Sequence, residues 1–114
     1  MNKKRVLEIY NFLANASMKR MNDDEKIQFI RLLRQMKPAA KEMQEAVNDA
    51  VMKAQQESVK DFADFVGKAV SDIANEDTDI SINVMTADTF KHLCFSNDWT
   101  FNQVDELEEL LVKK

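Results

Sequence analysis

An apolar stripe, with spacings that alternate between four and three residues, runs without a break from Phe29 to Ala54. Its members are Phe29, Leu33, Met36, Ala40, Met43, Val47, Ala50 and Ala54. Because these spacings keep the side chains on one helical face, the stripe predicts a long helix with a coiled-coil-like seam. Pro38 lies inside the stripe and is expected to kink the helix or to start a new segment, since proline has no backbone N–H.

Residues that favour turns are scarce, with one glycine and one proline among 114 residues. Helices joined by short turns are therefore expected. The first helix is predicted from Val6 to an end near Lys19–Arg20, where cations suit a helix C-terminus. Asn22 and Glu25 then have the spacing of a capping box, which starts the long helix and makes the pair an antiparallel hairpin.

The apolar stripe loses its phase after Ala54, and a break is expected within Gln55–Ser58. Ser58 together with Asp61 is expected to cap a further helix, which continues to Ile73.

The C-terminal part contains the only alternating apolar pattern, in Ile80–Val84, and this pattern predicts a short strand. Thr86 is expected to cap the next helix. Thr100 and Gln103 have the spacing of a second capping box, which starts the last helix.

These elements predict a mostly α fold: an antiparallel helical hairpin with a long coiled-coil-like second helix, one short strand and two short C-terminal helices. The length fits a single domain, 1–114. Within it, residues 1–74 are expected to form the helical hairpin or bundle, and residues 75–114 the strand and the two short helices.

Charge is distributed unevenly along the chain. Residues 1–41 contain ten Lys and Arg against four Asp and Glu, whereas residues 42–114 contain six against sixteen. The basic first third could contact nucleic acid or a protein partner. The candidate contact residues are Lys4, Arg5, Lys19, Arg20, Arg31 and Arg34. Alternatively, the acidic part of the chain neutralises these cations, and the overall net charge of −4 favours this second interpretation.

The cellular compartment is inferred from the absence of disulfides, a signal peptide and a membrane span in the sequence. Cys94 is the only cysteine, so no internal disulfide is expected. The basic N-terminus is not followed by an apolar segment of signal-peptide type, and no stretch is apolar enough to span a membrane. A cytoplasmic location without membrane contact is therefore expected.

Catalytic chemistry is not indicated. His92 is the only histidine, and its position two residues from Cys94 places the two side chains on different sides of a helix. Asn75, Asp77 and Asp79 have the spacing of the first calcium ligands of an EF-hand, but the glycine and the glutamate that the loop then needs are missing. We expect no enzyme activity, no cofactor and no metal site.

The hairpin region resembles a known group of proteins. Phe12–Leu13, Met18–Met21 and Phe29–Leu33, with the Lys- and Glu-rich helix that follows, resemble short helical-hairpin proteins encoded by tailed phages and prophages. Those proteins have an opening helix, a basic turn, an aromatic-Ile-basic-Leu-Leu helix and an acidic C-terminal half. The resemblance covers about the first half of the chain. It implies a phage setting in the host cytoplasm and supplies no catalytic residues.

The leading hypothesis is a non-enzymatic protein that acts through protein–protein contacts, in phage assembly or in takeover of the host. One alternative is a nucleic-acid-binding protein that uses the basic hairpin. Another is a small anti-defence inhibitor or ligand sponge.

Self-association is also expected, as a dimer. A single strand leaves its backbone N–H and C=O groups unpaired, so the strand with Ile80, Ile82 and Val84 needs a partner strand. The same strand of a second copy is the simplest partner.

Overall fold

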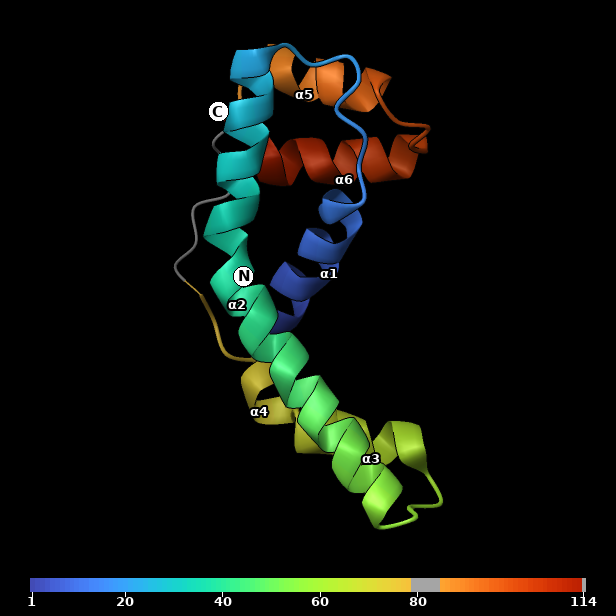
Figure 1. Ribbon diagram of the computed structural model, residues 1–114. Helices are drawn as coiled ribbons and strands as arrows, with labels where there is room; N and C mark the ends of the chain where they lie inside the picture. Colours follow the sequence, from blue (N-terminus) through green and yellow to red (C-terminus); the bar gives the residue numbers. More distant parts are fainter. Residues whose placement is uncertain (79–84, 114) are drawn as a thin grey trace. The chain divides into compact units, whose positions relative to one another are not determined.

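The computed structural model describes residues 1–78 and 85–113, and within these ranges all of the regular elements are helices (Figure 1). They are α1 (Lys3–Ala14), α2 (Asp23–Gln56), α3 (Phe62–Ala69), α4 (Ser71–Ala74), α5 (Ala87–Phe95) and α6 (Phe101–Leu111). The predicted mostly α fold, with a helical hairpin of α1 and a long α2 and two short C-terminal helices, is confirmed. The strand predicted at 80–84 lies outside the described residues.

The start of α2 follows the predicted capping box. The Asn22 backbone N–H donates to Glu25 Oε1 at 3.0 Å, and the Glu25 N–H donates to Asn22 Oδ1 at 2.9 Å. The end of α1 was predicted too late, because the helix stops at Ala14 and not near Lys19–Arg20. The Ser17 N–H donates to a side chain that is distant in sequence, Asn97, and so does not continue the helix.

Pro38 does not start a new segment, since α2 is helical through it over 34 residues. The helix ends at Gln56, within the predicted break. Ser58 then takes a positive φ of 51° and does not cap α3. The N-cap is Asp61, whose side chain accepts from the Asp64 N–H, so the prediction for Ser58 was wrong.

Six of the eight stripe residues of α2 are buried, and the exceptions are Leu33 and Val47. Leu32 is fully buried, while Leu33 is only half-buried. The buried residues of α2 therefore run from Phe29 through Leu32 to Met36. Phe29, Met36, Met43 and Ala50 keep the seven-residue spacing and stay buried, so it is the packing of α2 that selects Leu32 over its neighbour Leu33.

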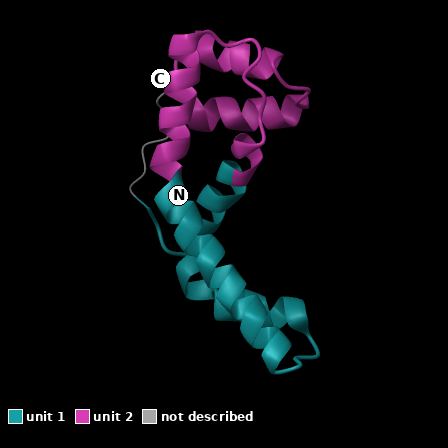
Figure 2. Cartoon of the chain, viewed as in Figure 1, with its two compact units in different colours: residues 1–10, 37–79 teal, residues 11–36, 80–114 magenta. Residues whose placement is uncertain are grey.

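The described residues form two compact units, and α1 and α2 each contribute to both (Figure 2). Unit 1 contains residues 1–10 and 37–79, and unit 2 contains 11–36 and 80–114. In unit 1 a small core on α2 and the α3–α4 region consists of Met43, Ala50, Val70 and Ala74. Half-buried apolar side chains, Leu7, Ala46, Val47, Val66 and Ile73, pack against this core.

Unit 2 holds α5 and α6 beside the N-terminal turns of α2. The fully buried apolar side chains of this unit are Leu13, Phe29, Leu32, Met36, Met85, Leu93 and Leu111. A bridge between Met85 and Val112 joins the two ends of the α5–α6 pair. Thr86 caps α5, and Thr100 and Gln103 form the complete capping box of α6, as predicted.

Candidate functional site

The six basic residues predicted as contact residues do not belong to one unit. Lys4 and Arg5 are in unit 1, where Arg5 pairs with Glu8 at 3.4 Å. Lys19 and Arg20 lie in the turn before α2, and Arg31 and Arg34 are exposed on α2; these four are in unit 2. The structure therefore divides the predicted basic site between the two units.

Neutralisation within the chain does occur at the N-terminus. The buried Lys3 side chain places Nζ 2.8 Å from Glu42 and 3.0 Å from Glu76. The hydrogen bond to Glu42, and then that to Glu76, raises the pKa of Lys3 above its ordinary value. This cation is thus held by the acidic part of its own unit.

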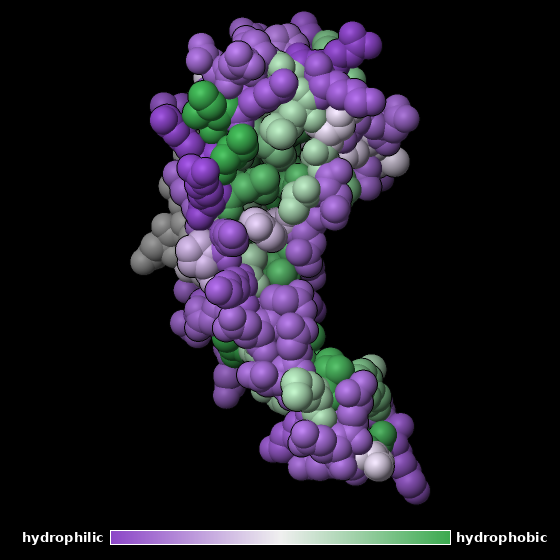
Figure 3. Space-filling view, in the orientation of Figure 1, coloured by the Kyte–Doolittle hydropathy of each residue, from purple (hydrophilic) through white to green (hydrophobic). Residues whose placement is uncertain are grey.

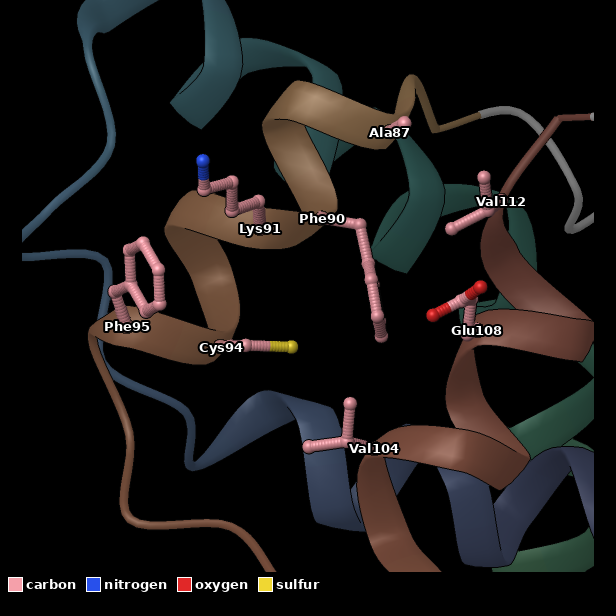
Figure 4. Close-up of a pocket in the computed structure, with 8 residues that line it drawn as sticks. All are labelled: Ala87, Phe90, Lys91, Cys94, Phe95, Val104, Glu108 and Val112. Atoms are coloured by element: carbon pink, nitrogen blue, oxygen red, sulfur yellow. The ribbon is translucent and has the colours of Figure 1, made fainter. Parts of the chain in front are cut away.

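A pocket of about 280 Å³ lies between α5 and α6 (Figure 4). Its lining is mostly apolar: Ala87, Phe90, Lys91, Cys94, Phe95, Val104, Glu108 and Val112. Phe90, Cys94 and Val104 point into the space between the helices, whereas Phe95 lies at its edge (Figure 4). Since Lys91, Phe95 and Glu108 are exposed, the pocket opens to solvent.

The thiol in this pocket is poorly suited to nucleophilic chemistry. Burial, and then the charge of Glu108, raises the pKa of Cys94 to about 11. Because the thiolate is the reactive form, Cys94 is protonated and weakly reactive at neutral pH, and it acts as an apolar lining residue of the pocket.

The two most exposed large apolar side chains of the described residues are Phe95 at 65%, which lines the pocket, and Phe101 at 81%, which is three residues before the lining residue Val104 on α6. Phe101, Asp105 and Glu108 follow one another at spacings of four and three and so share one face of α6. We call Phe95, Phe101, Asp105 and Glu108, with the pocket, the acidic-aromatic surface. Lys91 is part of its rim, with Nζ 5.7 Å from the centre of the Phe95 ring.

His92 has a partner that the sequence did not reveal. Its Nδ1 lies 2.6 Å from Glu25 Oε2, and the Glu25 side chain is only 9% exposed. The hydrogen bond from the Asn22 N–H, supported by His92, lowers the pKa of Glu25, although burial acts in the opposite direction. The pair links α5 to the start of α2 and is not part of the pocket lining.

The lowered pKa of Glu25 leads to a prediction for acid stability. Because the folded state lowers this pKa below 4.5, the carboxylate stabilises the fold above that pH. The contribution is lost as the pH falls through the folded pKa. In Glu25→Gln, which retains an acceptor for Asn22, the unfolding free energy should be lower than in wild type at neutral pH, with the difference closing in acid. Urea titrations from neutral pH to about pH 3 measure it.

Asp24→Asn provides the matched control, since Asp24 is exposed next to Glu25. Its pH profile should follow that of wild type. A constant difference between Glu25→Gln and wild type down to acid pH would show that the charge of Glu25 does not stabilise the fold.

Neither a cluster of metal ligands nor a membrane-spanning helix is found in the described residues. Within 1–78 and 85–113, no three His, Cys, Asp or Glu side chains gather as metal ligands would. The helices described also include none that is both long and apolar enough to cross a membrane.

The acidic-aromatic surface is the site that the sequence reasoning missed. Phe101 is three residues before Val104 and so continues the spacing of the inward residues, which provides no signal of its 81% exposure. Comparison with known proteins adds no assignment, because no family model, curated protein or solved structure matches the chain.

Proposed function

We propose that this chain is a non-enzymatic protein-interaction module, and that it binds its partner through the acidic-aromatic surface. The observation that carries the proposal is the open pocket between α5 and α6, with the exposed Phe95 in its lining and the exposed Phe101 three residues before its lining residue Val104. Aromatic side chains, phenylalanine included, are enriched in the cores of protein interfaces, where a few anchor residues contribute most of the binding energy.

The open rim of the pocket favours a protein over a free small molecule. Ligand pockets usually have volumes of about 300–1,000 Å³ and enclose most of the ligand. This pocket has about 280 Å³ and is open along the exposed side chains of its rim. It suits one or two apolar side chains that a partner projects from its own surface, and it suits a ligand sponge less well.

The histidine and the cysteine, two side chains that enzymes often use in catalysis, are poorly suited to it in this structure. His92 contacts Glu25, and Glu25 in turn accepts from the start of α2. Cys94 has a raised pKa. These contacts support a binding role. The resemblance of the hairpin to proteins of tailed phages suggests the setting, which would be phage assembly or takeover of the host.

Site-specific photo-crosslinking tests the proposal. A benzophenone amino acid at position 101 should yield a discrete protein adduct in extract of the cells in which the chain is expressed naturally. The same probe at Asn48, which is exposed on α2 in unit 1, should not yield that adduct. Mass spectrometry then identifies the adduct.

Two results would overturn the proposal in favour of nucleic-acid binding. These are the absence of any adduct specific to position 101, together with retention of the chain on DNA or RNA that weakens steeply with salt. Loss of that retention in Arg31→Glu/Arg34→Glu would assign it to the basic residues of α2.

A further inference from the structure

A second exposed surface of unit 2 lies on α2. Ile27 is 48% exposed and Ile30 is 37% exposed. Arg31 and Arg34, each four residues further on, share their face of the helix and are also exposed. We call these four residues the basic stripe. In the space-filling view, hydrophobic side chains reach the surface over the N-terminal turns of α2, among hydrophilic neighbours (Figure 3).

The basic stripe faces away from the core. The buried residues of this part of α2 are Phe29, Leu32 and Met36, and they lie on the opposite side of the helix. The two isoleucines are therefore not needed to hold unit 2 together. Asp23 and Asp24 in the first turn precede the stripe, so its positive charge lies toward Arg34.

The basic stripe and the acidic-aromatic surface are complementary in both charge and shape. One is a convex helix face with two aliphatic side chains and two arginines. The other is an apolar pocket with Glu108 in its lining, and Asp105 is exposed three residues before Glu108 on the same face of α6. Aliphatic side chains on one surface fit a pocket on the other, and guanidinium groups pair with carboxylates.

Both surfaces belong to the same compact unit of one chain. The α2 turns that carry the stripe are fixed to α5 by the Glu25–His92 contact, and Thr86 donates its N–H to Gln28 at 3.1 Å. A side chain of the stripe cannot leave this position to reach the pocket of its own unit without unfolding it. The two surfaces can therefore meet only between two chains.

We propose, resting on the interaction role above, that the partner is a second copy of this chain. The basic stripe of each copy docks on the acidic-aromatic surface of the other across a two-fold axis. Ile27 and Ile30 enter the pocket, and Arg31 and Arg34 lie against Asp105 and Glu108. The two-fold arrangement forms this contact twice, which helps to reach the roughly 1,200–2,000 Å² that specific interfaces bury.

The charges that oppose this arrangement are few. In the proposed dimer, Lys91 on the rim of the pocket would face the basic stripe of the other copy. Within its own chain, the Lys91 ammonium lies near the Phe95 ring. Asp23 is at the far end of the stripe. Because the pairs are at an exposed interface, association should weaken as salt rises, and the apolar contacts should retain part of it.

Charge reversal with mixing tests the proposal on the full chain. Light scattering at micromolar concentration should give wild type a mass of twice 13.2 kDa. Arg31→Glu/Arg34→Glu and Asp105→Lys/Glu108→Lys should each raise the dimer dissociation constant about a hundredfold or more, because each places like charges together. An equimolar mixture of the two variants should recover the dimer, since both contacts of the mixed pair then join opposite charges.

Controls separate this result from a loss of folding. All substituted positions are exposed, and circular dichroism and the melting temperature should show both variants folded. Lys53→Glu/Lys60→Glu, which reverses two exposed lysines in unit 1, should dimerise as wild type does.

A monomeric wild type, or a dimer that survives both reversals, overturns the proposal. Either result would leave the proposed interaction role open, and capture of a different protein by the probe at position 101 would then support that role. Dimerisation that reversal abolishes, but that mixing does not recover, would also overturn the pairing of these two surfaces.

Discussion

Leu32→Ala is expected to lower the unfolding free energy by about 2–4 kcal/mol. Leu32 is fully buried on α2 in unit 2, between Phe29 and Met36, so its truncation removes apolar contacts and leaves a cavity. Leu33→Ala, at the neighbouring half-buried position, should cost only about 1 kcal/mol, because its side chain loses less contact with the core. Urea titration followed by circular dichroism measures both variants.

The Leu32–Leu33 pair is its own matched control. Both variants remove the same atoms from adjacent positions of one helix and have the same helix propensity. The difference between them therefore reports burial alone. Equal losses, or a larger loss at Leu33, would show that the seam follows the strict seven-residue stripe.

Asn97→Ala is expected to cost about 2 kcal/mol. The Asn97 side chain accepts from the Ser17 N–H at 2.8 Å and donates to the Ser17 carbonyl at 3.0 Å and the Leu93 carbonyl at 2.9 Å. It thus joins the turn after α1 to the end of α5. Alanine removes all three hydrogen bonds and leaves the backbone groups of Ser17 without this partner. Thermal and urea unfolding measure the change.

Asn102→Ala is the control, because Asn102 is exposed on α6 and should change stability by less than about 0.5 kcal/mol. Asn97→Asp is a second variant that keeps an acceptor for the Ser17 N–H and loses both donations. If Asn97→Ala were as stable as Asn102→Ala, the turn after α1 would not depend on this contact.

Of the candidate site, the sequence supplied the basic residues but not the surface to which we assign partner binding. Arg31 and Arg34 were identified from charge alone, and they are exposed on α2 as expected of contact residues. The pocket between α5 and α6 was not foreseen. Its lining comes from α5, α6 and Val112, and no local spacing indicates that Cys94 and Val104 face the same space.

The sequence alone determined where three of the six described helices begin. The capping boxes of Asn22 with Glu25 and of Thr100 with Gln103, and the cap at Thr86, all appear as predicted. Each of these is a local arrangement, in which donor and acceptor are three residues apart, so the chain needs no tertiary contact to specify them.

Three features became known only from the tertiary structure. They are the end of α1 at Ala14, the burial of Leu32 in preference to Leu33, and the contact of His92 with Glu25. Each of these depends on which helix faces pack together. Ser17 and Asn97 are 80 residues apart, and Glu25 and His92 are 67 residues apart. Helical periodicity specifies the apolar side of each helix to within about one residue, and packing against residues distant in sequence selects between the neighbours.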